Sequence, residues 1–214
     1  MAELLHWTPQ VLKRMIREMP TETIAKMLFT VDEFHRMGDL GILPDHVRFE
    51  LIRGEIIEMA TPGPPHAGRV DRLNRLFTSK LGESAIVRIQ NPFLIGIHSE
   101  ALPDVAILKA VDSFYQTRHP GPEDVLLLVE VSHSTVSYDG RVKSAVYAEC
   151  GVPEYWQLDV NKGTLIVRTH PQNGAFENTR IYQRGETVAP GQTNCTFTVD
   201  EMLGPLDSNP PEEK

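Results

Sequence analysis

Residues 125–132 read Val-Leu-Leu-Leu-Val-Glu-Val-Ser, and this stretch decides the fold. Its first seven residues contain a single polar side chain, Glu130, and no turn-forming residue. An unbroken apolar run of this length is typical of a strand that is covered on both faces. We therefore expect residues 125–131 to form the central strand of a sheet with helices packed on both sides.

The segments around this strand predict a mixed α/β fold. Apolar residues recur at helical spacing between residues 64 and 82, and a second helix is expected over about 139–149. Short apolar runs separated by turn residues predict the strands. We expect strands at residues 47–52, 55–59, 85–89, 92–97, 104–108, 155–160, 164–169 and 180–183. Arg53-Gly54, between the first two runs, predicts a two-residue hairpin turn.

The first forty residues carry helix signals. A helical pattern runs from Thr8-Pro9 to Pro20, and residues 21–29 can form a further short helix. Thr30 and Glu33 have the spacing of a capping box. We expect an N-terminal helical arm over residues 1–44 and a core over 45–200. Residues 207–214 are polar, acidic and broken by prolines, and we expect a flexible tail over residues 201–214.

The composition narrows the class of protein. Of the 214 residues, 41% are hydrophobic and 23% charged, which excludes disordered, collagen-like and coiled-coil chains. No apolar run is long enough to span a membrane and the first residues do not resemble a signal peptide, so we expect a cytoplasmic protein that does not enter the membrane. Cys150 and Cys195 supply neither a disulfide framework nor a thiolate zinc site.

The net charge constrains the partners. The chain has 21 basic and 29 acidic residues, a formal charge of −8. Because binding to phosphates depends on positive charge, a nucleic-acid partner must meet a local basic patch. Arg69, Arg72 and Arg75 lie mostly off the apolar face of the expected helix at 64–82. This basic side is either solvated or a nucleic-acid contact surface, and the sequence leaves both readings open.

Two acidic residues stand at the ends of expected strands. Asp104 precedes an apolar run, and Glu130 lies near the end of the central strand, where an unpaired carboxylate is costly to bury. If these strands are neighbours, both carboxylates can face one cavity and bind Mg²⁺ or Mn²⁺. Lys143 is then a candidate to assist phosphodiester hydrolysis. Taken singly, Asp104 can equally belong to a turn, and Asp139 with Lys143 can form an exposed ion pair.

A series of short motifs covers about residues 45–170. The motifs are Phe49-Glu50-Leu-Ile-Arg-Gly54-Glu55-Ile, Pro64-Pro65-His66, Pro103-Asp104-Val105, Val129-Glu130-Val-Ser-His-Ser-Thr135, Tyr138-Asp139, Lys143, Tyr147 and Gly151-Val-Pro-Glu-Tyr-Trp156. In this order they resemble the Uma2 family, also called DUF820. The resemblance implies a restriction-endonuclease-like fold of the PD-(D/E)XK superfamily, with a mixed central sheet flanked by helices.

The resemblance also implies the site residues. Asp104 and Glu130 would bind Mg²⁺ or Mn²⁺ together with the main-chain carbonyl of Val131. The superfamily's lysine commonly lies two residues after the second acid, where this chain has Ser132. Lys143, on the following helix, occupies the matching position of Uma2-like sequences.

Other residues receive supporting roles from the same resemblance. The superfamily analogy adds a third acid from the early segment, for which Glu50 and Glu55 both fit, with Glu50 preferred. His66, Ser132 and Asp139 would support the site.

These inferences lead to one interpretation and one alternative. We interpret the chain as a Mg²⁺-dependent endonuclease acting on DNA, and a homodimer is expected by analogy with nucleases that cut two strands. The alternative is a catalytically inactive nuclease fold that binds nucleic acid or protein.

Overall fold

The computed structural model describes residues 26–205. Within this range, six strands form a central sheet in the order β10-β9-β8-β7-β6-β3. Only β7 and β8 are parallel, and the other neighbours in this sheet are antiparallel. The strands are β3 (Ala85–Ile89), β6 (Val105–Lys109), β7 (Val125–Ser132), β8 (Glu154–Asp159), β9 (Thr164–Gln172) and β10 (Ala175–Tyr182). The mixed α/β fold with the apolar run at its centre is therefore confirmed.

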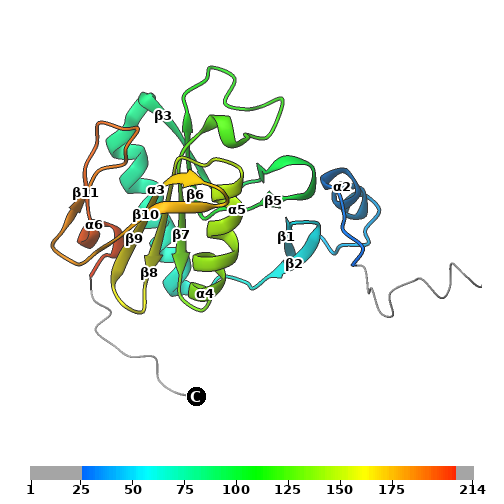
Figure 1. Ribbon diagram of the computed structural model, residues 1–214, viewed down its shortest axis with the longest axis horizontal. Helices are drawn as coiled ribbons and strands as arrows, with labels where there is room; N and C mark the ends of the chain where they lie inside the picture. The colour runs from blue at the N-terminus through cyan, green and yellow to red at the C-terminus, as the bar shows by residue number, and fades with distance from the viewer. Residues whose placement is uncertain (1–25, 206–214) are drawn as a thin grey trace, which may run out of the picture.

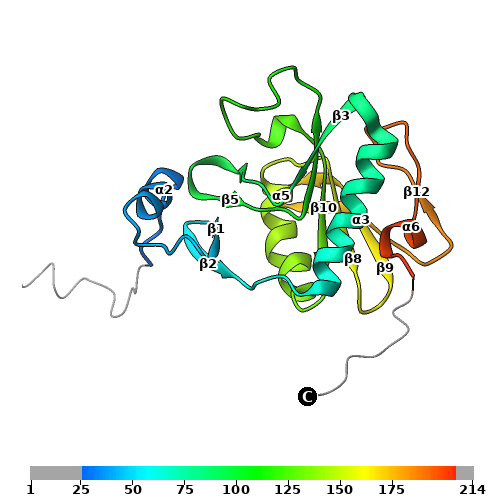
Figure 2. The same ribbon diagram turned by 180° about the vertical axis from the view of Figure 1, so that it is seen from behind.

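Helices cover both faces of this sheet (Figures 1 and 2). One face carries α3 (Pro64–Leu81) and α6 (Val199–Leu203). The other face carries a continuous helical segment made of α4 (Val136–Tyr138), a π-helical turn (Asp139–Lys143) and α5 (Ser144–Glu149). Because side chains alternate along a strand, from Leu127 onward the odd-numbered residues of β7 pack toward α3 and the even-numbered ones toward α5.

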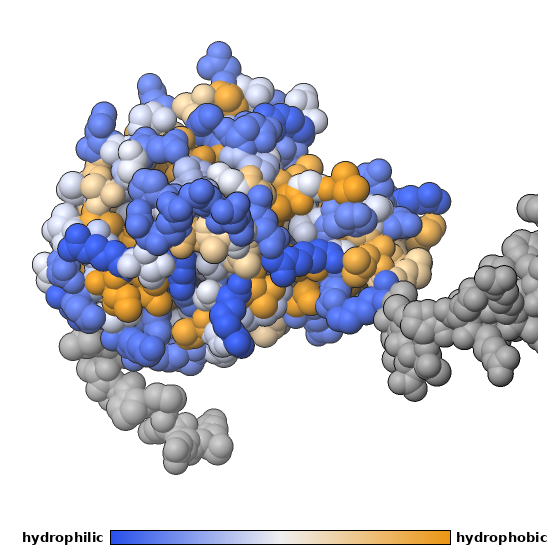
Figure 3. Space-filling view, viewed as in Figure 1, coloured by the Kyte–Doolittle hydropathy of each residue, from blue (hydrophilic) through white to orange (hydrophobic). Residues whose placement is uncertain are grey.

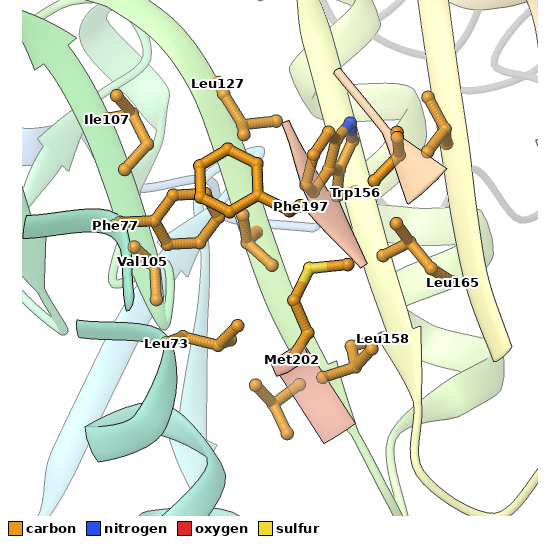
Figure 4. Packing of buried hydrophobic residues seen from close by; sticks show 14 of the residues in the cluster. Leu73, Phe77, Val105, Ile107, Leu127, Trp156, Leu158, Leu165, Phe197 and Met202 are labelled. Atoms are coloured by element: carbon orange, nitrogen blue, oxygen red, sulfur yellow. The ribbon is translucent and has the colours of Figure 1, made fainter. Parts of the chain in front are cut away.

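The core on the α3 side is dense with aromatic rings (Figure 4). Phe77 of α3 packs against Phe197 with ring centroids 4.7 Å apart, and both rings contact Trp156 of β8. All three side chains are fully buried. Burial of a side chain of this size stabilises the fold by roughly 1.5–3 kcal/mol, so this cluster fixes α3 against the sheet.

A second, smaller sheet stands beside the central one. It has the order β2-β1-β5-β4, with β1 (Arg48–Ile52), β2 (Glu55–Met59), β4 (Phe93–Leu94) and β5 (Glu100–Ala101). The predicted hairpin is confirmed: Arg53 and Gly54 have φ of 51° and 78°, the left-handed values that a type I′ turn requires. The hairpin belongs to this small sheet and not to the central one.

Helix α2 (Val31–Asp39) packs on the small sheet and begins at the predicted capping box. The Thr30 hydroxyl accepts from the Glu33 N–H, and the Glu33 carboxylate accepts from the Thr30 N–H. Residues 26–30 are not helical, so the helix expected at 21–29 is wrong over 26–29. The helix expected at 8–19, residues 21–25 of the one at 21–29 and residues 206–214 of the tail lie outside the described residues. The start of the expected flexible tail is wrong, because residues 201–203 belong to α6 and Met202 and Leu203 are buried in the core.

Other predicted elements differ in extent. In place of a strand at 92–97, only β4 forms, and a 3-10 turn follows at Gly96–His98. Strand β10 starts earlier than predicted because it is an exposed edge strand whose side chains are mostly polar, so it carries no apolar signal. The short pair β11 (Thr187–Val188) and β12 (Phe197–Thr198) was not predicted.

Several large hydrophobic side chains remain at the surface of the small sheet and its helix (Figure 3). They are Met27, Leu28, Leu40, Ile42 and Ile97. None of the helices in the described part of the chain has the length and apolar character needed to cross a bilayer.

Candidate active site

A buried ion-pair cluster joins the two sheets. Glu130 belongs to the even-numbered residues of β7, so its side chain points toward the helical segment that carries Lys143. The Lys143 Nζ donates to Glu130 Oε1 at 3.0 Å and to Glu50 Oε1, from β1, at 2.9 Å. The Tyr147 hydroxyl, one helical turn further on, also donates to Glu130 Oε1 at 2.8 Å. These four side chains are buried.

Glu50 is the acid that the small sheet contributes. Its Oε1 accepts the Leu102 N–H at 2.7 Å in addition to the ammonium of Lys143. Its Oε2 is buried and has no hydrogen-bond partner among residues 26–205. Glu55, the other predicted third acid, lies on the far side of the hairpin turn and pairs with Lys26 at the surface. The structure thus brings Glu50 into the cluster and leaves Glu55 outside it.

Asp104 lies directly before β6, beside the end of β7. The antiparallel pairing of Val105 with Val129 places Asp104 opposite Glu130, and the N–H of the next residue, Val131, donates to Asp104 Oδ2 at 2.9 Å. The Asp104 N–H in turn donates to Glu130 Oε2 at 3.3 Å. The two predicted acids are therefore neighbours, as adjacency of their strands required.

Two further side chains hold Asp104 from the opposite direction. His66 Nε2 lies 3.0 Å from Asp104 Oδ1, and Gln90 Nε2 donates to the same oxygen at 2.9 Å. Gln90 is itself held by Arg48, whose Nη1 donates to the amide oxygen at 3.0 Å. This set of contacts fixes the Asp104 carboxylate in one orientation.

A cavity of about 250 Å³ opens over the cluster. Its lining includes Asp104, Glu130, Lys143, His66 and Val131. A water molecule occupies roughly 30 Å³ of liquid, so the cavity has room for several waters or for a phosphate group with waters around it.

Burial and the neighbouring charges shift the pKa values of the cluster residues. Burial raises the pKa of Glu130 well above its usual value, and the positive charge of Lys143 opposes this only in part. Burial alone would lower the pKa of Lys143, but the negative charges of Glu130 and Glu50 raise it. Lys143 is therefore an ammonium at neutral pH, and it is the cation that holds two acids in place.

His66 and Asp104 shift each other's pKa in opposite directions. The hydrogen bond to Asp104 raises the pKa of His66 despite its partial burial. Burial alone would raise the pKa of Asp104, but the hydrogen bond and charge of His66, with help from Gln90 and the Val131 N–H, lower it. Asp104 is thus an ionised carboxylate at the edge of the cavity.

The donor set fits a small hard cation. Asp104 and Glu130 offer carboxylate oxygens, and the Val131 carbonyl faces the same side, where it also contacts His66. Mg²⁺ typically takes one or two carboxylates and keeps several waters. Lys143 pairs with two of the three buried acids, Glu50 and Glu130, and His66 lies against the third, Asp104. No three His, Cys, Asp or Glu side chains in residues 26–205 form a complete metal cage, so such a cation would depend on the carbonyl and on water.

Two of the predicted supporting residues lie one layer behind the acids. Ser132 and Thr135 both donate their hydroxyls to Asp139 Oδ2, and Asp139 is buried. The alternative reading of Asp139 and Lys143 as an exposed ion pair is therefore wrong. The π-helical turn buries both residues, and Lys143 pairs with the glutamates.

Only two of the three arginines predicted to form a basic surface on α3 are exposed. Arg69 is buried and donates to the Pro65 carbonyl at 2.9 Å, whereas Arg72 and Arg75 are exposed on α3.

Gln90 and Arg48 were not identified from the sequence as residues of the site. Gln90 follows β3 at a φ of 51°, and it is this left-handed conformation that turns its amide toward Asp104. Neither residue forms a motif with a recognisable spacing. The only available signal was the Gln-Asn-Pro sequence at 90–92, which marks a turn and not a site.

Comparison with known protein families agrees with this geometry. The model of the Uma2 family, described as "Putative restriction endonuclease", matches residues 31–199. The chain belongs to the Uma2 family. The match to Uma2 confirms the resemblance drawn from the motifs at residues 45–170 and supports a restriction-endonuclease-like nuclease.

Among solved structures, this Uma2 chain is similar to a crystal structure described as a putative nuclease belonging to DUF820 from Anabaena variabilis ATCC 29413. The two chains are 15% identical, and the match covers 82% of this chain and 97% of the other with a TM-score of 0.63. At this identity the likeness shows a shared fold. The search of curated proteins finds no match.

Proposed function

We propose that this Uma2 protein is a divalent-cation-dependent endonuclease that hydrolyses phosphodiester bonds in DNA. One observation carries the proposal: Asp104, Glu130 and Lys143 come from separate elements of the chain and meet at one cavity. Two acids and a lysine in a shared hollow are the groups that metal-assisted hydrolysis needs.

Asp104, Glu130 and the Val131 carbonyl would hold Mg²⁺ or Mn²⁺. When bound, such a cation lowers the pKa of its water and neutralises charge on a phosphate. The residues behind it fix the ligands: His66 and Gln90 orient Asp104, and Tyr147 orients Glu130.

Lys143 serves this site in two ways. Its ammonium holds Glu130 and Glu50 in a fixed arrangement through two of its three N–H donors. The third N–H has no partner among residues 26–205, and Lys143 lines the cavity. That donor is placed to bind a water or a phosphate oxygen and so to stabilise negative charge that develops during hydrolysis.

The test is plasmid nicking with Mg²⁺, with Mn²⁺ and with EDTA. Asp104→Asn and Glu130→Gln remove a carboxylate charge with little change in shape. Loss of a residue that only supports a metal ligand costs about 10–100-fold, so loss of a ligand is expected to cost more. Asp71→Asn, an exposed acid on α3, is the matched control and keeps full activity. Nicking in EDTA, or nicking that survives both site substitutions, would remove the assignment.

The alternative function is a non-catalytic module that binds nucleic acid or protein. The pairing of Glu50 with Lys143 and the absence of a three-side-chain cage in residues 26–205 favour it. The module predicts no divalent-dependent nicking by the wild type and no change in melting temperature when Mn²⁺ is added. The endonuclease predicts divalent-dependent nicking by the wild type and a change in melting temperature when Mn²⁺ is added.

Three expectations remain predictions: the homodimer, the cytoplasmic location and the division into an arm, a core and a tail. For the homodimer, the exposed hydrophobic side chains on the small sheet and its helix are the surface to test.

A further inference from the structure

A second hollow of about 510 Å³ lies next to the candidate active site. Three cationic residues line it, Arg69, Lys162 and Arg184, and none of the described lining residues is acidic. This concentration of positive charge contrasts with the chain as a whole, whose formal charge is −8.

The two hollows adjoin. His133, in the loop after β7, lines both of them. Helix α3 runs along both as well, because His66 lines the first hollow and Arg69, three residues later and on the same side of the helix, lines the second. Asn161 Nδ2 donates to the His133 carbonyl at 2.6 Å, which fixes the wall between them.

The three cations are held in different ways, and Arg69 Nη1 donates to the Pro65 carbonyl at 2.9 Å. Arg184 Nη1 donates to Asp200 Oδ1 at 2.9 Å and to the Gly204 carbonyl at 3.0 Å. Its Nε is buried and has no hydrogen-bond partner within the described part of the chain. Lys162 is 75% exposed and lies 4.0 Å from its nearest acid, Asp159, so its ammonium can reach over the hollow. Arg184 is thus fixed by contacts within the protein, and Lys162 can move to a ligand.

We infer that this hollow binds the phosphodiester backbone of a nucleic-acid strand beside the bond that is cut. The inference rests on the proposed function, since it makes the second hollow the continuation of the substrate path. A polyanion with regularly spaced phosphates suits a cationic hollow that opens into the site of hydrolysis. It also explains how a chain of net negative charge can bind such a ligand.

Binding of a fluorescein-labelled DNA duplex by the full-length protein, measured by anisotropy in EDTA over a range of salt concentrations, tests this inference. Each lost phosphate contact makes the salt dependence of log K shallower by about 0.9. Lys162→Gln is the main variant because its side chain is exposed and its nearest acid, Asp159, is 4.0 Å away. Lys109→Gln removes the same charge at the exposed end of β6, roughly 16 Å along the strand from Asp104.

The inference predicts weaker binding and a shallower slope for Lys162→Gln and unchanged binding for Lys109→Gln. Arg184→Gln, accepted only if its melting temperature shows a folded protein, is expected to act like Lys162→Gln. Equal slopes for the wild type and Lys162→Gln would overturn it, as would an equal loss in Lys109→Gln. Polyglutamate that competes as well as DNA would assign the hollow to an acidic peptide. Nicking assays separate the two failures: active protein with equal slopes refutes only the hollow, and inactive protein refutes the function.

Discussion

Replacing Lys143 by methionine removes the cation at the centre of the ion-pair cluster and keeps a side chain of similar length. In the wild type its side chain is 2% exposed, and its ammonium donates to Glu50 and Glu130 at 2.9 and 3.0 Å. Methionine leaves these two buried carboxylates facing each other with no cation between them. Removing one member of a buried ion pair costs about 3–5 kcal/mol because the partner charge stays buried.

This cost is large against a total stability of roughly 5–15 kcal/mol. At about 2–4 °C for each kcal/mol in a chain of this size, the melting temperature of Lys143→Met falls by roughly 6–20 °C. The assay is urea and thermal unfolding followed by circular dichroism. Lys109→Met, at an exposed position, is the control and stays within about 0.5 kcal/mol of the wild type.

A double variant makes the test specific. Glu130→Gln added to Lys143→Met removes one of the two stranded charges, so part of the lost stability returns. The interaction energy between contacting residues is typically about 0.5–3 kcal/mol. A loss below about 1 kcal/mol in Lys143→Met, or strictly additive effects in the double variant, would refute the view that this lysine balances the buried acids.

Three further predictions concern other parts of the chain. Gln90→Leu removes a donor to Asp104, and we expect roughly 10–100-fold weaker Mn²⁺ binding by calorimetry with little change in fold; unchanged affinity would contradict this. Asp124, whose pKa the hydrogen bond to Arg118 lowers, stabilises the native state above the usual carboxyl pKa of about 4, and this contribution is lost as the pH falls below that value. The stability difference between the wild type and Asp124→Asn should therefore shrink on acidification, and a difference that grows would reverse the sign. Phe77→Ala opens the aromatic core and should cost about 3–5 kcal/mol in urea unfolding; a loss under half of that would show that the core closes around the gap.

The central parts of the fold were predictable because their patterns are local. The unbroken apolar run at 125–131 indicated a strand covered on both faces, and the apolar spacing at 64–82 predicted α3 to within one residue. The separate small sheet could not be foreseen, since β4 and β5 have two residues each and form only through pairing with β1. The exposed edge strand β10 was underestimated for the same reason, because its neighbour and not its own sequence defines it.

The site was predictable only where acids interrupt apolar strands. Glu130 was indicated by the cost of burying a carboxylate, Asp104 by its place before an apolar run, and the position of Lys143 by family resemblance. The choice between Glu50 and Glu55 depended on which side of the hairpin faces the central sheet, a tertiary fact. Gln90 reaches Asp104 through a left-handed backbone conformation that no residue pattern announces.

The most direct test of the whole account is a crystal structure of the protein soaked with Mn²⁺, with the ion located by anomalous scattering. We predict one peak between the carboxylates of Asp104 and Glu130, within coordinating distance of the Val131 carbonyl, and the Lys143 ammonium still bound to Glu50. An absent peak, or a peak held only by residues outside this cavity, would contradict the account.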